Sequence, residues 1–238
     1  MDNELFNQIK NNIDQVMEEL AAAAAKAGRK ESEIRLMSVT KTKPYDYVEA
    51  AYQSGSRLFG ENRVNELSEK FSDFYPDGEV HLIGHLQRNK AKEAVKYASS
   101  IDSIDKFETA QAVNKYCAEL GKTIDILLEY NTSGEASKSG FQNEDEFFRT
   151  VDRIRELENV RIRGLMTVGP LTGDRDEIRS AFRHLVALFR RVDELHPDLK
   201  ICELSMGMSS DFDIAIEEGS TIIRIGTRLF GARQYPTV

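Results

Sequence analysis

Cysteine, proline and tryptophan are scarce in this sequence of 238 residues, which has two cysteines, five prolines and no tryptophan. Cys117 and Cys202 lie far apart in apolar surroundings, so we expect reduced core residues and no disulfide framework. No apolar run approaches the roughly 20 residues that a membrane-spanning helix needs. The acidic, amphipathic first residues are unlike a signal peptide. These absences predict a cytoplasmic protein with no membrane partner.

Positive charge is also in deficit, since 32 lysines and arginines face 40 aspartates and glutamates, and the net charge is −8. The basic residues form no single run. Nucleic acid is therefore not an expected partner, because its binding depends on basic contacts to phosphates. Hydrophobic residues make up 40% of the chain, enough for a sizeable core. We find no linker or composition break, so residues 1–238 are predicted to form one domain.

Hydrophobic periodicity alternates between strands and helices along the chain. After a first helix over residues 1–28, eight apolar runs each precede a helix or, for the last, a short tail. The expected strands lie at 34–39, 57–59, 81–84, 99–104, 123–130, 161–167, 200–204 and 220–225. Eight such units predict an α/β fold, a single closed (β/α)₈ barrel of the TIM type with the N-terminal helix packed on it. An open doubly wound sheet is the alternative, because strand count does not prove closure.

The run from Ile34 to Pro44, IRLMSVTKTKP, carries the first candidate for chemistry. Strand side chains alternate between faces, so Met37, Val39 and Lys41 share one side. If that side faces a core, the Lys41 amine stands at the mouth of the interior. There, partial loss of solvent lowers its pKa and lets it form an imine with a carbonyl compound. A solvated surface lysine is the alternative.

Glycine, serine and asparagine gather where the predicted strands end, which is the edge where such barrels carry their sites. The loops after strands seven and eight, Ser205–Asp211 and Arg224–Thr227, combine Gly207 and Gly226 with hydroxyl groups. Loops in these positions commonly hold a phosphate. The alternative is structural: the first loop supplies only a helix cap, and Gly207 only a turn.

Arg224 shares strand parity with Ile222, so it stands inside the barrel mouth if that face looks inward. A buried guanidinium requires an acceptor. Glu203 is a structural candidate, and a heteroaromatic nitrogen of a ligand is the functional one. An imine-forming lysine, phosphate-binding loops and a cation for a ring nitrogen together indicate pyridoxal 5′-phosphate (PLP). His81 and His85 lack a further ligand in register, so no metal site is expected.

Six motifs resemble the YggS/PROSC family of pyridoxal phosphate homeostasis proteins: SVTKTKP, FGENRVNE, HLIGHLQRNK, GLMTV, LSMGMSSDF and RIGTRLFGAR. The match runs from the N-terminal helix to Arg233. One departure is Asn65, where relatives usually carry glutamine. The resemblance implies the fold of the alanine racemase N-terminal barrel.

The resemblance also implies which residues surround the cofactor. Lys41 is the Schiff-base lysine and Arg224 faces the pyridine nitrogen. The other implied residues contact the phosphate or the ring: Ser205, Gly226 and Thr227 hold the phosphate, Met206 and Gly207 belong to its loop, and Asn62 and Met166 line the ring. His85 and Lys138 are rim residues without a firm role.

The implied function is PLP homeostasis, in which a carrier stores the cofactor and passes it to apo-enzymes without amino-acid turnover. An arginine beside the ring nitrogen disfavours its protonation and weakens the ring as an electron sink. Related racemases use a tyrosine from an added β-domain, which we do not expect here, so a monomer is expected. The alternative is a PLP-dependent racemase or lyase with Glu61, His85 or a tyrosine as base. A sugar-phosphate aldolase using Lys41 is a third possibility.

Overall fold

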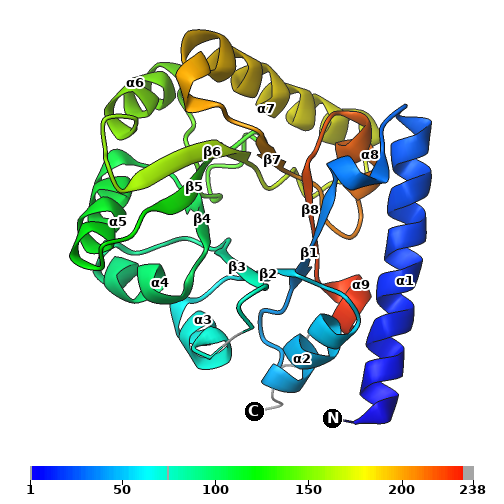
Figure 1. The fold of residues 1–238 in the computed structure, drawn as a ribbon. Helices are drawn as coiled ribbons and strands as arrows, with labels where there is room; N and C mark the ends of the chain where they lie inside the picture. The colour runs from blue at the N-terminus through cyan, green and yellow to red at the C-terminus, as the bar shows by residue number, and fades with distance from the viewer. Residues whose placement is uncertain (1, 74, 233–238) are drawn as a thin grey trace.

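A computed structural model describes residues 2–73 and 75–232 of the chain. Eight parallel strands close into a barrel in chain order, with the last strand paired to the first (Figure 1). The strands are β1 (Arg35–Val39), β2 (Leu58–Glu61), β3 (Glu79–Leu82), β4 (Ser100–Ile104), β5 (Ile124–Glu129), β6 (Val160–Met166), β7 (Glu203–Ser205) and β8 (Ile222–Ile225). The predicted closed barrel is therefore confirmed, and the open sheet is excluded.

Helices cover the outside of the barrel (Figure 1). They are α1 (Asn3–Lys26), α2 (Tyr45–Gln53), α3 (Val64–Phe71), α4 (Ala91–Tyr97), α5 (Phe107–Glu119), α6 (Glu144–Ile154), α7 (Arg175–Leu195), α8 (Phe212–Glu217) and α9 (Thr227–Phe230). α7 begins at Arg175 because Asp174 caps it, accepting a hydrogen bond from the Asp176 backbone N–H at 2.9 Å. No helix in the described part of the chain is both long and apolar enough to cross a bilayer.

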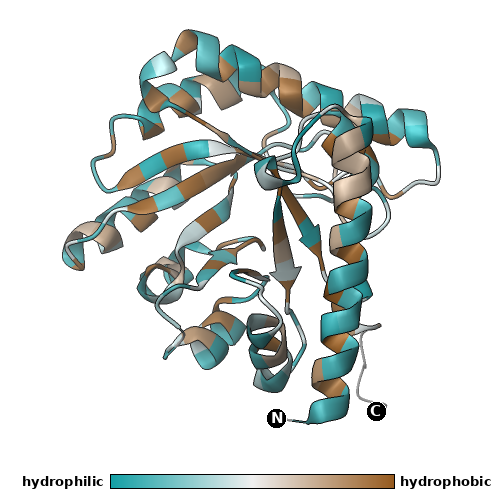
Figure 2. Cartoon of the chain, turned by 45° about the vertical axis from the view of Figure 1, so that its right-hand side comes forward, coloured by the Kyte–Doolittle hydropathy of each residue, from teal (hydrophilic) through white to brown (hydrophobic). Residues whose placement is uncertain are grey.

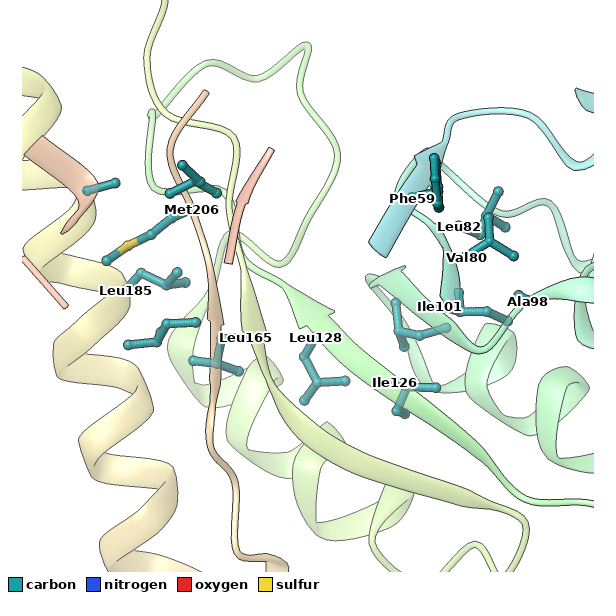
Figure 3. Close-up of a cluster of buried hydrophobic side chains, with 14 of the residues drawn as sticks. Phe59, Val80, Leu82, Ala98, Ile101, Ile126, Leu128, Leu165, Leu185 and Met206 are labelled. Carbon is teal, nitrogen blue, oxygen red and sulfur yellow. The ribbon is translucent and has the colours of Figure 1, made fainter. Parts of the chain in front are cut away.

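The main hydrophobic core lies between the strands and the helices. Figure 3 shows part of it, including Leu128 and Leu165 of the strands and Leu185 of α7. A separate inner cluster lies within the barrel and is formed by Met37, Val39, Leu58 and Ile222. The inward faces predicted for the first and last strands are therefore the observed ones.

The first helix, α1, lies along α2, α8 and α9 on one side of the barrel. Asp2 caps it by accepting a hydrogen bond from the Glu4 backbone N–H at 2.9 Å. In Figure 2, hydrophilic and hydrophobic residues alternate along the ribbon of α1. One face of the helix buries side chains at three- and four-residue spacing, namely Ile9, Ile13, Val16 and Leu20.

We propose that α1 and the barrel unfold as one cooperative domain. Leu20 is completely buried, so Leu20→Ala is expected to lower the free energy of unfolding by about 3 kcal/mol through lost contacts and a cavity. Urea titration followed by circular dichroism and by tyrosine fluorescence should give one coincident transition. The half-exposed Leu120 provides the control, since Leu120→Ala should change stability by less than about 0.5 kcal/mol. Two separate transitions would contradict the proposal.

The structure corrects the prediction that both cysteines belong to the core. Cys117 is buried, but Cys202 is exposed, and both are free thiols. The sulfur of Cys202 accepts a hydrogen bond from Arg163 Nη2 at 3.0 Å. β7 starts only at Glu203, so Cys202 precedes the strand at a solvent-facing position.

Candidate functional site

A cavity of about 410 Å³ opens at the carboxyl ends of the strands. Its walls come from the ends of, and the loops after, β1, β2, β3, β6, β7 and β8. Five residues of the predicted cofactor shell line it: Lys41, Asn62, Arg224, Gly226 and Thr227. Residues from opposite ends of the sequence therefore meet at one place, because β1 and β8 are neighbours in the closed barrel.

Lys41 lies two residues beyond the end of β1, on the inward side that Met37 and Val39 establish. It is partly buried and lines the cavity, so a wholly solvated surface lysine is not what the structure shows. The next residue, Thr42, has a φ of 65°. A β-branched residue rarely adopts this left-handed conformation. The turn that carries Lys41 is therefore strained and requires contacts that hold it.

Arg224 lies inside the barrel and is only 5% exposed. Its Nη1 donates a hydrogen bond to Ser205 Oγ, and its Nη2 donates one to the Thr167 carbonyl oxygen, both at 2.8 Å. The structural partner considered for it, Glu203, forms an ion pair with Arg35 at 3.5 Å instead. Glu203 is therefore not the acceptor, but Arg224 does have structural acceptors in Ser205 and Thr167.

Negative charge surrounds the Arg224 guanidinium within the barrel. Burial lowers the pKa of Arg224, while the carboxylates of Asp102, Glu129 and Asp211 oppose this change by favouring the charged form. Arginine has so high an intrinsic pKa that it stays protonated here. The cavity therefore has a fixed positive charge among its lining residues.

Hydroxyl groups form the part of the cavity near α8 and α9. Ser209, Ser210 and Thr227 line it together with Gly226. A Cβ atom at Gly226 would lie 3.1 Å from the Val39 carbonyl oxygen, so glycine lets the loop after β8 approach the end of β1 closely. Hydroxyl and backbone N–H groups on such loops can donate hydrogen bonds to an anion.

Two members of the predicted phosphate loop support the lining without belonging to it. Ser205 is completely buried and accepts the hydrogen bond from Arg224. Gly207 has a φ of 95°, and a Cβ atom there would lie 2.5 Å from the Ala215 Cβ. Glycine at this position therefore allows the loop to turn and to pack on α8.

Met206 and Met166, which the resemblance placed around the cofactor, are both buried. Neither is among the described residues that line the cavity. Met206 belongs to the main core between the barrel and the helices, where Figure 3 draws it in the same cluster as Leu185. Met166 is 1% exposed, at the end of β6. Direct contact of either side chain with a cofactor remains a prediction.

The cavity also contains residues that the sequence had not singled out. Lys43 lines it, and burial lowers the pKa of its amine. Its Nζ donates a hydrogen bond to the Ala232 carbonyl oxygen at 3.1 Å. The motif SVTKTKP contains both Lys41 and Lys43, but nothing in the sequence indicated that both side chains line the same cavity.

The rim residues make their own contacts. His85 Nδ1 lies 3.3 Å from an Asp105 carboxylate oxygen. Lys138 Nζ lies 2.6 Å from Glu135 and donates a hydrogen bond to the Gly169 carbonyl oxygen at 2.9 Å. Lys138 therefore ties the loop after β5 to the loop after β6.

Glu61, a candidate base in the enzymatic alternative, lies on the outer side of the barrel, next to α3. Its Oε1 accepts hydrogen bonds from Thr40 Oγ1 at 2.7 Å and from Lys70 Nζ at 2.9 Å. Because successive strand residues face opposite sides, Glu61 and Thr40 point away from the cavity that Lys41 lines. The structure therefore gives Glu61 a supporting position.

A buried pair of titratable groups lies within the barrel. His81 Nδ1 is 2.9 Å from Asp102 Oδ2, and Ser100 Oγ donates a hydrogen bond to Asp102 Oδ1 at 2.6 Å. Burial lowers the pKa of His81, but the Asp102 charge and hydrogen bond outweigh it and raise the pKa to about 9. Residues 2–73 and 75–232 contain no cluster of three or more histidine, cysteine or acidic side chains placed to hold a metal.

Glu129 gives stability a testable pH dependence. Burial, followed by the nearby charge of Asp105, raises the pKa of its carboxyl from 4.5 to about 7, although Arg224 opposes the rise. Between these values the folded protein binds more protons than the unfolded chain, so stability falls as pH rises. The free energy of unfolding of the wild type, relative to Glu129→Gln, should drop by about 3 kcal/mol from about pH 5 to about pH 8. Urea titrations at both pH values would measure this, and a constant difference would contradict it.

Comparisons with known proteins identify the family of this chain. A family model described as "Alanine racemase, N-terminal domain" matches residues 7–234. A protein of Vibrio alginolyticus named pyridoxal phosphate homeostasis protein is 37% identical over 235 residues, which cover 97% of this chain and 100% of the relative. A protein of the same name from Escherichia coli K12 is 35% identical over 234 residues, covering 97% and 99%.

Solved structures give the same result. PipY of Synechococcus elongatus, solved with PLP bound, is 32% identical with a TM-score of 0.82, covering 94% of this chain and 100% of PipY. An alanine racemase of Clostridium difficile is 16% identical with a TM-score of 0.76, covering 100% of this chain and 61% of the racemase, and shows a shared fold only. The resemblance seen in the sequence is thus confirmed. This chain belongs to the family of pyridoxal phosphate homeostasis proteins, on the barrel fold of the alanine racemase N-terminal domain.

Proposed function

We propose that this chain binds PLP in the cavity at the barrel mouth and holds it as a Schiff base on Lys41. One observation carries the proposal: an amine, a buried guanidinium and several hydroxyl groups converge on the same cavity. The PLP-bound structure of PipY, a relative at 32% identity, supports it. When bound, PLP supplies an aldehyde that condenses with an amine and a ring that withdraws electrons.

The residues present fit this cofactor. Lys41 supplies the amine, and Ser209, Ser210 and Thr227 supply hydroxyl donors of the kind that a phosphate accepts from. Arg224 presents a permanent cation toward which a ring nitrogen can point as an acceptor. The absence of a Cβ at Gly226 keeps the end of β1 and the loop after β8 close together. The cavity volume of about 410 Å³ is within the range of small-molecule sites.

We propose supporting roles for the remaining predicted residues. Asn62 lines the cavity and would contact the ring. Ser205 holds Arg224 in place, while Gly207 allows the phosphate loop to pack on α8. Met206 and Met166 stabilise the strand ends from buried positions.

We propose that binding serves to store PLP in the cytoplasm and to deliver it to apo PLP-dependent enzymes. Two observations favour a carrier over a racemase or lyase. Arg224 stays charged and so disfavours protonation of the ring nitrogen, which weakens electron withdrawal. Glu61 lies outside the cavity and cannot serve as the base. We also propose that the protein is a monomer, which light scattering on the purified protein would test.

The test uses the purified full chain. Added PLP should give the absorbance of a Schiff base, and borohydride should convert it to a stable adduct that peptide mass mapping places on Lys41. Incubation with amino acids in heavy water should give no exchange at the α-carbon. An adduct at another lysine would contradict the site, whereas sustained exchange would support the racemase or lyase alternative.

A further inference from the structure

The turn that carries Lys41 is held on both sides by one buried cluster on the outer face of the barrel. The cluster consists of Glu61 at the end of β2 and of Glu66 and Lys70 on α3, and we call it the Lys70 clamp. The side chains of Lys70 and Glu61 are 8% and 0% exposed, and that of Glu66 is 16% exposed. Charged groups this deeply buried are rare unless they are paired.

Lys70 uses all three protons of its ammonium group. Its Nζ donates to the Thr40 carbonyl oxygen at 2.9 Å, to Glu61 Oε1 at 2.9 Å and to Glu66 Oε2 at 2.8 Å. An ammonium has three donors, so the group is fully satisfied. The backbone immediately before Lys41 is thereby fixed to α3.

Glu66 fixes the backbone immediately after Lys41. Its Oε2, the atom that receives the bond from Lys70, also accepts a hydrogen bond from the Thr42 N–H at 2.6 Å. Burial raises the pKa of Glu66, but the hydrogen bonds from Lys70 and Thr42 outweigh it and lower the pKa, so the carboxylate is charged. Charge-assisted bonds of this kind are stronger than neutral ones.

The contact to Thr42 also accounts for its backbone. A left-handed φ at a β-branched residue costs of order 1–3 kcal/mol and persists only where neighbouring contacts enforce it. The bond from Thr42 to Glu66 is such a contact, and it lies directly beside Lys41. An ion pair with a purely structural role does not require a strained backbone next to it. The strain at Thr42 lies directly beside the inferred functional amine of Lys41, so it favours a role for the cluster in placing that amine.

We propose that the Lys70 clamp positions the Lys41 amine for its reaction with the PLP aldehyde, an inference that depends on the proposed function. In that reaction the uncharged Lys41 nitrogen bonds to the aldehyde carbon. A C=N bond replaces the C=O bond, and the oxygen leaves as water with the two amine protons. Misplacement of a reacting atom by about 1 Å can slow such a step by about a hundredfold. None of the three clamp residues lines the cavity itself.

The decisive comparison is Glu66→Leu against Glu66→Gln. Leucine removes the acceptor for both Thr42 and Lys70, whereas the glutamine carbonyl oxygen can still accept from them. Stopped-flow absorbance at increasing PLP concentration separates the limiting rate of Schiff-base formation from the half-saturating concentration. Glu66→Leu should reduce the limiting rate about tenfold to a hundredfold with little change in half-saturation, and Glu66→Gln should recover most of it.

Two further variants complete the design. Lys70→Met removes the other arm of the clamp and should show the same loss of limiting rate. Lys96→Met removes a lysine from an exposed ion pair with Glu93 on α4 and should leave the rate unchanged. Melting temperature and circular dichroism identify any variant that fails to fold, and Glu66→Leu and Lys70→Met each test the proposal without the other.

The outcomes separate the two proposals. A wild-type protein that forms no adduct at Lys41 contradicts the proposed function. A wild type that forms it, with Glu66→Leu or Lys70→Met folded and equally fast, contradicts the clamp alone. A lower melting temperature with an unchanged limiting rate shows a structural role only and also overturns the inference.

Discussion

Lys41→Ala is expected to abolish the borohydride-stable adduct and to leave only PLP that dialysis removes. Lys41 is the lysine that strand parity places on the inward side of β1, and the structure finds it in the cavity wall. Without its amine no C=N bond can form at this position, although the hydroxyl groups and Arg224 remain for weaker binding. Absorbance spectra and peptide mass mapping before and after reduction would measure the loss, which should be complete within detection.

Lys43→Ala is the matched control, because Lys43 lines the same cavity two residues further along the chain. We expect the adduct to remain on Lys41 in this variant. If the adduct persists in Lys41→Ala, or disappears in Lys43→Ala with Lys41 intact, the assignment of the Schiff base to Lys41 is wrong. The double variant would then show whether either amine can replace the other.

Arg224→Met is expected to lower the free energy of unfolding by about 3–5 kcal/mol, the usual result of removing one partner from buried charges. Methionine fills similar space but leaves Asp102, Glu129 and Asp211 without the cation that favours their charged forms. It also leaves Ser205 and Thr167 without the hydrogen bonds that they accept. Urea denaturation at about pH 8 would measure the loss.

The loss in Arg224→Met should be smaller at about pH 5, because Glu129 is then protonated and needs no cation. Arg161→Met provides the control. Arg161 lies on a strand and pairs with Asp125 at 2.7 Å, but it is 64% exposed, so its removal should cost less than about 1 kcal/mol. Equal effects of the two substitutions would show that the charges inside the barrel are not coupled to Arg224.

Much of the fold could be predicted because two periodicities alternate clearly. α7 is one example, because its buried apolar residues recur at helical spacing, namely Ile178, Phe182, Leu185, Leu188 and Val192. Parity also placed Lys41 and Arg224 on the inner side, because Met37, Val39 and Ile222 are apolar neighbours of known spacing. Boundaries were less certain where a strand is short, and β7 proved to cover only Glu203–Ser205.

The positions of Met206 and of the Lys70 clamp could not be derived from sequence. Met206 directly follows a three-residue strand, too short for a pattern to show that it faces the helices. Glu66 and Lys70 are four residues apart, a spacing that favours an ion pair on a helix, but this spacing says nothing about the contact of Lys70 with Thr40. That contact depends on the register between β1 and β2, in which Val39 pairs with Gly60. Alignment between strands is a three-dimensional property that local sequence does not determine.

The cavity lies at the seam where β1 meets β8, with Met37 opposite Arg224. During synthesis the segment with Lys41 leaves the ribosome well before the segment with Arg224 and Thr227, which follows roughly 180 residues later. A nascent polypeptide therefore has no complete cavity until β8 docks on β1, and contacts so distant in sequence form slowly. Any ligand that bridges this seam would favour the closed form by mass action. Vitamin supply would then influence how much newly made protein reaches its mature state.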